Sequence, residues 1–209
     1  MPGAPGAEAL HAACAARGLG PALIPDVVRY LQLLERWNRV HNLTAVKGAE
    51  AMVDRHVLDS LSVLPWLQGR NVLDVGSGAG LPGLVLALAD RSREYLLLDA
   101  AAKRVRFLRA AIAELGLGHV DTVHGRVEDL HPDPGFATVV SRAFAAPPEF
   151  VRLAGHCLAP GGRMLAMLGQ AAATEAALPP GWSYRSVEPV RIPGSQASRH
   201  IAVIERESA

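Results

Sequence analysis

Four glycines that directly follow an apolar run are the residues whose spacing most clearly indicates chemistry. They lie in the segment LDVGSGAGLPG, residues 73–83. Glycine lacks a Cβ, so it lets the backbone turn sharply and approach a ligand closely. A helix expected to begin near Leu81 would point its N-terminus, which favours a negative group, at the same ligand. The segment therefore predicts a cofactor-binding loop at the carboxyl end of a strand, where open α/β sheets bind ligands.

One interpretation of this loop is a dinucleotide site. Gly78, Gly80 and Gly83 satisfy the pattern G-x-G-x-x-G, and Asp99 follows about 20 residues later, as in the dinucleotide fingerprint. On this interpretation the chain is an NAD(P)-dependent oxidoreductase, and the three glycines let the backbone approach the pyrophosphate.

The residues around the loop favour S-adenosylmethionine instead. The first glycine after the expected strand is Gly76, which gives the register G-x-G-x-G with Gly78 and Gly80. Asp74 precedes Gly76, and a carboxylate there would repel a pyrophosphate but hold a cationic amine. The methionine carboxylate would then meet the loop amides, and Asp99 would accept hydrogen bonds from the ribose hydroxyls. The alternative for both aspartates is that they only cap helices.

The end of the expected fourth strand indicates which acceptor a methyl group would reach. Residues 140–144 read VSRAF and contain neither an Asn/Asp-Pro-Pro-aromatic segment for an exocyclic amine nor a Pro-Cys pair for attack on a pyrimidine. Cys157 falls late in a helix, where we expect a core residue. Guanine N7 has its own lone pair and needs no base, so alignment alone supplies much of the catalysis. Arg142 would bind the methionine carboxylate or guanine O6.

The pattern of apolar residues predicts the elements that position these groups. Apolar residues recur at helical spacing over 26–40 and 49–66. From residue 71, short β-rich runs alternate with helices, which predicts a parallel sheet. The expected strands are 72–75, 95–99, 120–124, 136–141, 163–168, 182–190 and 199–206. The expected helices are 81–90, 102–116 and 147–158, with a turn at 159–162 that ends the last of them.

The composition restricts the partners and the compartment. Lys and Arg number 21 against 20 Asp and Glu, so nucleic-acid binding would need a local basic patch. Cys14 and Cys157 lie far apart, which argues against a disulfide framework or a zinc site. There is no run of about 20 apolar residues and no export signal. We therefore expect a cytoplasmic protein with no membrane span and no metal.

Seven short segments form a specific combination over nearly the whole chain. They read RWNRVHNLTAV at 36–46, RHVLDSL at 55–61, LDVGSGAGLPG at 73–83, LLLDAAAKRVRFL at 96–108, GRVEDL at 125–130, SRAF at 141–144 and SRHIAVI at 198–204. In this order and spacing they resemble the RsmG family, also called GidB, which methylates N7 of a guanine in small-subunit (16S) ribosomal RNA.

The resemblance implies a fold and a cofactor. The fold is α/β, a Rossmann-like S-adenosylmethionine-dependent methyltransferase fold with a mostly parallel seven-stranded sheet and an antiparallel edge strand. Residues 1–68 would form an N-terminal helical extension and residues 69–209 the methyltransferase domain. The cofactor is S-adenosylmethionine, with S-adenosylhomocysteine as the product. The partner is small-subunit ribosomal RNA or the 30S particle, bound by a monomer without an obligate protein partner.

The resemblance also implies roles for individual residues. Cofactor contacts are implied for Gly76 and Leu81, an adenine site at Val127 and Glu128, and contact with the cofactor or the target base for Arg142. The residues that match motifs near the acceptor side, and that we therefore list as catalytic candidates with Arg142, are Asn42, Arg55 and His56, with Ser60 beside them. The alternative for Arg55 is a surface ion pair with Asp59, four residues on.

Contacts with RNA are expected on the helix over 102–116. Lys103, Arg104 and Arg106 mark its polar face, and Phe107 falls off its apolar stripe. Bases stack on aromatic rings flanked by cations, so Phe107 is a candidate base platform unless the N-terminal helices or the tail cover it. In the last motif, Arg199 and His200 are further candidates.

One position departs from the family pattern. Where relatives typically read Lys-Gly-Gln, this chain has Leu168-Gly169-Gln170. A lysine that would meet phosphate or cofactor is missing, which leaves open a ribosome-assembly module that binds the cofactor without turnover.

Overall fold

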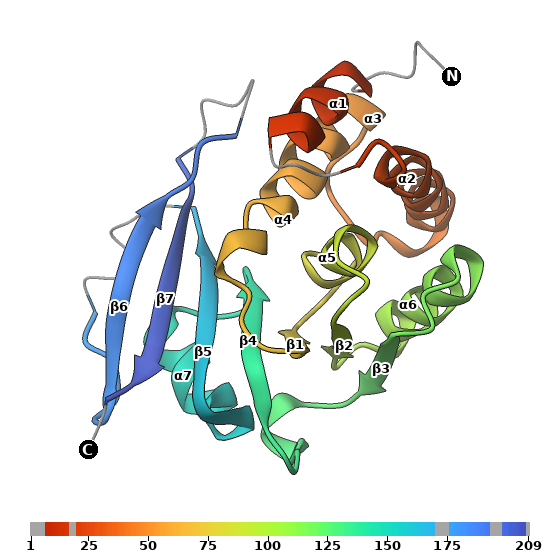
Figure 1. Cartoon of the computed structure of the whole chain (residues 1–209). Coiled ribbons are helices and arrows are strands. Elements are labelled where there is room, and N and C mark those ends of the chain that lie inside the picture. Colours follow the sequence, from red (N-terminus) through yellow and green to blue (C-terminus); the bar gives the residue numbers. More distant parts are fainter. Residues whose placement is uncertain (1–6, 17–19, 170–175, 193–197, 208–209) are drawn as a thin grey trace.

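The computed structural model describes residues 7–16, 20–169, 176–192 and 198–207. Its strands are β1 (Asn71–Val75), β2 (Glu94–Asp99), β3 (Val120–His124), β4 (Phe136–Arg142), β5 (Leu158–Leu168), β6 (Trp182–Pro189) and β7 (His200–Arg206). They form one sheet in the order β3-β2-β1-β4-β5-β7-β6 (Figure 1). β1 to β5 are parallel, and β7 runs antiparallel to β5 and β6. The expected mostly parallel seven-stranded sheet is confirmed.

Helices cover both faces of this sheet (Figure 1). They are α5 (Gly83–Ala89), α6 (Ala102–Leu115) and α7 (Pro147–Ala154), with short 3₁₀ turns η3 (Val127–Asp129) and η4 (Gly155–Cys157). Successive strand residues point to opposite faces, so Val72 joins the core under α5 and α6 while Leu73 joins the core under α7. Such burial on both faces explains why the parallel strands are almost continuously apolar.

The N-terminal segments form a third group of helices above α5 and α6 (Figure 1). They are α1 (Ala7–Ala16), α2 (Leu23–His41), α3 (Ala49–Met52), the π-helix η1 (Val53–Leu58), α4 (Asp59–Leu61) and the 3₁₀ turn η2 (Leu64–Trp66). The single helix expected over 49–66 is therefore broken into four pieces. Apolar residues of these helices share one core cluster with α5 and α6.

Polar contacts join α2 to the domain beneath it. The buried Tyr30 hydroxyl donates to the carbonyl of Ala79 at 2.7 Å. Arg29 donates to the carbonyl of Glu114 at 2.6 Å, and Arg36 forms an ion pair with the Glu114 carboxylate at 2.9 Å. α2 is thus attached both to the glycine loop and to the end of α6.

The turn predicted at 159–162 is wrong, because these residues belong to β5. α7 ends at Ala154, well before them. Phe136 of β4 pairs with Leu158 and Thr138 pairs with Arg163, so β5 carries extra residues opposite β4. Gly161 has φ +72°, and a Cβ on Gly162 would lie 2.9 Å from the carbonyl oxygen of Ala137. The glycines therefore serve an irregularity within the strand.

The predicted stacking of RNA bases on Phe107 is also wrong. Phe107 is 0 % exposed, because α2 lies across this face of α6. Its ring meets that of Trp37 edge-on, with centroids 5.7 Å apart. The aromatic side chain that falls off the apolar stripe of α6 is the one that packs against the N-terminal helices.

None of the helices in the described ranges is both long enough and apolar enough to cross a membrane.

We expect Phe107→Ala to lower the free energy of unfolding by about 3–5 kcal/mol, because it leaves a cavity between α2 and α6. Urea unfolding measures this. Arg106→Ala, an exposed change on the same helix, should stay within about 0.5 kcal/mol of the parent. A Phe107→Ala protein as stable as the parent would show that the two helices are not packed as described.

Candidate functional site

The glycine loop takes the tight path that its sequence predicts. Gly76, Gly78 and Gly80 have φ of +72°, +56° and +85°, in the left-handed region that favours glycine. The amides of Gly76 and Ser77 donate to the carbonyl of Leu98 on β2, at 2.9 and 3.0 Å. The loop is therefore held at the carboxyl ends of β1 and β2.

Asp74 lies beneath this loop rather than in a ligand cavity. Its side chain is fully buried, and Oδ2 accepts a hydrogen bond from the amide of Gly83 at 2.9 Å. Burial raises the pKa of Asp74 to about 7. The expected contact with the cofactor ammonium is corrected, because Asp74 has no exposed surface with which to touch a ligand. Its carboxylate instead links β1 to the first residue of α5.

Asp99 accepts hydrogen bonds from two backbone amides, one directly before α6 and one in the glycine loop, but it is not the N-cap of α6. Oδ1 accepts from the amide of Ala101 at 2.8 Å, and Oδ2 accepts from the amide of Gly78 at 2.9 Å. Arg104 forms an ion pair with Oδ2 at 3.3 Å. Asp99 thus fixes the loop to the start of α6. Asp99 is 2% exposed and does not line the cavity described below, so contact with a ribose stays a prediction.

A cavity of about 650 Å³ opens next to the loop. Its walls come from the loop, the end of β4, the N-terminal helices and the start of β7. The predicted site residues among its lining are Arg55, Gly76, Gly78, Leu81, Arg104, Arg142, Arg199 and His200. The cavity therefore brings together residues of six of the seven sequence motifs, and within its described lining four arginines face a single carboxylate, that of Asp59.

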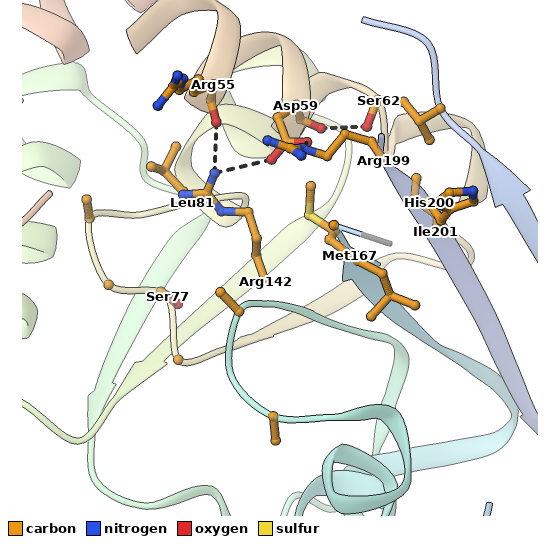
Figure 2. A pocket seen from close by; sticks show the side chains of 18 of the residues that line it. Arg55, Asp59, Ser62, Ser77, Leu81, Arg142, Met167, Arg199, His200 and Ile201 are labelled. Atoms are coloured by element: carbon orange, nitrogen blue, oxygen red, sulfur yellow. Dashed lines mark hydrogen bonds and ion pairs between the residues drawn. The ribbon is translucent and has the colours of Figure 1, made fainter. Parts of the chain in front are cut away.

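Asp59 joins two of these arginines (Figure 2). Nη1 of Arg142 lies 3.3 Å from Oδ2 of Asp59 and donates to the carbonyl of Arg55 at 3.0 Å. Nε of Arg199 lies 3.3 Å from Oδ1. The surface ion pair considered for Arg55 and Asp59 is thus replaced by pairs with Arg142 and Arg199. Because η1 has i→i+5 turns, the α-helical rule that places residues i and i+4 together does not hold there.

Asp59 is the residue of this site that sequence reasoning missed. Its place in RHVLDSL was the available signal, but only the fold brings β4 and β7 to it.

His56 and Asn42 lie outside the lining of this cavity. His56 is buried, and its Nε2 lies 2.8 Å from the hydroxyl of Thr44. Burial, with the charge of Arg142, lowers the pKa of His56 to about 4, so the ring is neutral at pH 7. Asn42 ends α2 with φ +49° and lines a second hollow with Lys47. Both residues therefore have structural roles, and neither lies where it would contact a ligand in the first cavity.

The remaining predicted residues lie around the cavity or on the surface near it. Val127 is buried in η3, where Glu128 is exposed, and neither lines the cavity. Gly80 is also outside the lining; a Cβ there would meet Leu84 at 2.3 Å. Arg106 is exposed on α6.

Two further predicted positions have defined surroundings. Lys103 donates to the carbonyl of His41 at 3.2 Å. Leu168 and Gly169 line the cavity at the position of the missing lysine, whereas Gln170 is outside the described residues. In the part of the chain that the structure describes, no three His, Cys, Asp or Glu side chains gather as a metal site would require.

Comparisons with a family model and with individual relatives identify the same family. The model of the family described as rRNA small subunit methyltransferase G matches residues 23–202. The Ribosomal RNA small subunit methyltransferase G of Marinobacter nauticus is 44% identical over 182 residues, 87% of this chain and 85% of that protein. Its counterpart in Nitrosospira multiformis is 45% identical over 188 residues, 86% and 87% of the two chains.

A solved structure shows the same fold at low sequence identity. The glycopeptide N-methyltransferase MtfA complexed with S-adenosylmethionine has a TM-score of 0.60 and 15% identity, over 78% of this chain and 90% of that one.

The raised pKa of Asp74 predicts a pH dependence of stability. Since the pKa rises from 3.8 to about 7, the folded chain binds more protons than the unfolded chain between these values. This contribution to stability therefore falls as pH rises from about 4 to 7. Asp74→Asn keeps an oxygen for Gly83 but cannot ionise. Its stability relative to the parent should rise across that window and level off above pH 7.

Urea unfolding of parent and variant at matched pH values measures this difference. The comparison cancels other titrating groups, including His56, whose lowered pKa makes stability rise with pH below about 6.5. A difference that does not vary with pH would contradict the raised pKa.

Proposed function

Because the chain belongs to the rRNA small subunit methyltransferase G family, we propose that it transfers a methyl group from S-adenosylmethionine to N7 of a guanine in small-subunit ribosomal RNA. It is an S-adenosylmethionine-dependent enzyme that methylates this RNA. What we propose beyond this is that N7 of guanine is the atom that accepts the methyl group. The oxidoreductase interpretation of the loop is set aside, because both the family and the G-x-G-x-G register of the glycines indicate S-adenosylmethionine and not a dinucleotide.

The residues beside the glycine loop fit this cofactor. Gly76 and Gly78 face the cavity without side chains, which leaves their backbone open to a ligand. We assign the methionine end to this stretch and to Leu81, the ribose to Asp99, and the adenine to the turn at Val127 and Glu128. When bound, S-adenosylmethionine supplies the methyl group: the N7–CH₃ bond forms as the S–CH₃ bond breaks, and positive charge moves from sulfur to the guanine ring.

The observation that most supports N7 as the acceptor atom is the pairing of the carboxylate that lines the cavity. Both carboxylate oxygens of Asp59 already pair with guanidinium groups, Oδ2 with Arg142 and Oδ1 with Arg199, so neither oxygen faces an acceptor unpaired. His56 is neutral but lies behind the cavity wall, hydrogen-bonded to Thr44. Guanine N7 offers a lone pair and needs no proton removed, so alignment by the surrounding residues is sufficient.

The charge of the cavity supports RNA as the acceptor. The whole chain has a formal net charge of only +1, yet among the described residues four arginines and one aspartate line this cavity. Positive charge is therefore concentrated where phosphates would bind. We assign RNA contacts to Arg199 and His200 at the start of β7 and to Arg104 on α6, with Lys103 and Arg106 beside it. We also propose that the enzyme acts as a cytoplasmic monomer on the RNA or on the 30S particle.

The test is to incubate the protein with methyl-labelled S-adenosylmethionine and small ribosomal subunits that lack the modification, and then to digest the RNA for nucleoside mass spectrometry. We expect new 7-methylguanosine, and we expect Arg142→Ala to lower kcat/KM about 100-fold or more because Arg142 joins the loop side to the acceptor side. Arg152→Ala, which removes an exposed arginine of α7 paired with Glu149, is the matched control.

The other outcomes are equally informative. Methyl label on a different atom of the RNA would keep the enzyme but reject N7. Binding of S-adenosylhomocysteine without any transfer would favour the alternative of an assembly module without turnover.

A further inference from the structure

The carboxylate of Asp59 joins three parts of the chain that are far apart in sequence. Asp59 begins α4, Arg142 ends β4, and Arg199 directly precedes β7. The Asp59 side chain is 8% exposed, whereas those of Arg142 and Arg199 are 21% and 29% exposed. Figure 2 shows the carboxylate between the two guanidinium groups at the cavity wall. The anion is thus inside the protein, and the two cations extend from it toward the cavity.

Asp59 uses only part of each guanidinium group. The polar contacts of Arg142 with described residues all use Nη1, which meets Asp59 and the carbonyl of Arg55. Arg199 meets Asp59 through Nε and the carbonyl of Ser198 through Nη1. A guanidinium carries five N–H donors in a rigid plane, so fixing one edge also fixes the direction of the others. Each arginine thus has N–H donors that no contact with the described residues occupies.

We propose that Asp59 is a positioning residue of the methyl transfer: it holds Arg142 and Arg199 so that their remaining donors bind the acceptor guanine at O6 and the adjoining RNA phosphate, and not N7. This inference rests on the proposed function. It assigns to Asp59 a role on the acceptor side and none in binding the cofactor.

Two physical reasons explain why these arginines need to be held. An arginine binds guanine most readily through O6 and N7 together, and a donor on N7 would occupy the lone pair that attacks the methyl group. Positive charge also moves onto the guanine during transfer, and nearby guanidinium groups oppose it. Because Asp59 fixes the two forks and offsets their charge, it reduces both effects.

The experiment compares the parent with Asp59→Asn on small ribosomal subunits, measuring kcat, KM for the subunits, Kd for S-adenosylhomocysteine and Tm. Asn has the same shape but no charge, so the arginines lose their ionic partner. We expect kcat to fall about 10- to 100-fold, while Kd stays within twofold. Glu149→Gln is the control, because it breaks an exposed ion pair with Arg152 and neither residue lines the cavity.

A second pair of variants tests whether Asp59 acts through Arg199. Arg199→Ala should lower kcat strongly in the parent but much less in Asp59→Asn, because the interaction is already lost there. If Asp59→Asn does not fold, Arg199→Lys replaces it: the charge is kept but the planar fork is lost, and kcat should still fall at least about fivefold.

Three results would overturn the inference. They are unchanged kcat in Asp59→Asn (or in Arg199→Lys, if that variant is used), a loss of S-adenosylhomocysteine binding as large as the loss of kcat, and equal effects of Arg199→Ala in both backgrounds. Failure of the parent itself to methylate the RNA would instead reject the proposed function.

Discussion

The hydrogen bond from the amide of Gly83 to the buried carboxylate of Asp74 is the contact on which the site depends. It connects β1 directly to the first residue of α5 across the glycine loop. A Cβ on Gly83 would lie 2.2 Å from Leu97 Cδ2 and 2.6 Å from Asp74 Oδ2, so the glycine is required by packing beneath the loop rather than by a ligand. Tyr30 of α2 holds the same loop from the other side through the carbonyl of Ala79. The loop is therefore shaped before any ligand arrives.

Most of the fold follows from the sequence because strand and helix periodicities are local. The strands from β1 to β4 and the helices α2, α5 and α6 lie within a few residues of their predicted positions. The errors have tertiary causes. Residues 159–162 look like a turn, but β4 pairs with both of their flanks, and Phe107 looks exposed until α2 covers it. The apolar spacing over 49–66 predicts a helix but does not distinguish the π turns of η1 from α turns.

The site was predictable to the extent that it is local in sequence. The glycines of the loop and the position of Arg142 at the end of β4 follow from the order of strands and helices. The partners of the aspartates do not. The position of Asp74 in the sequence suggests a ligand contact, but its complete burial shows a structural role. Asp59 acquires its arginine partners only when the fold brings β4 and the start of β7 to α4. Ion pairs between residues that are far apart in sequence cannot be predicted from residue spacing.

The π-helix at Val53–Leu58 makes the winding of this segment important for function, because it sets the direction of the side chain that follows. A π turn accommodates one more residue than an α turn, and Asp59 follows directly after it. If the same residues rewound as α-helix with none lost, the extra residue would turn the following side chain by about 100°. The carboxylate would then face away from both arginines although every motif residue was still present. Relatives are therefore best compared by the winding of this helix as well as by the identity of its residues.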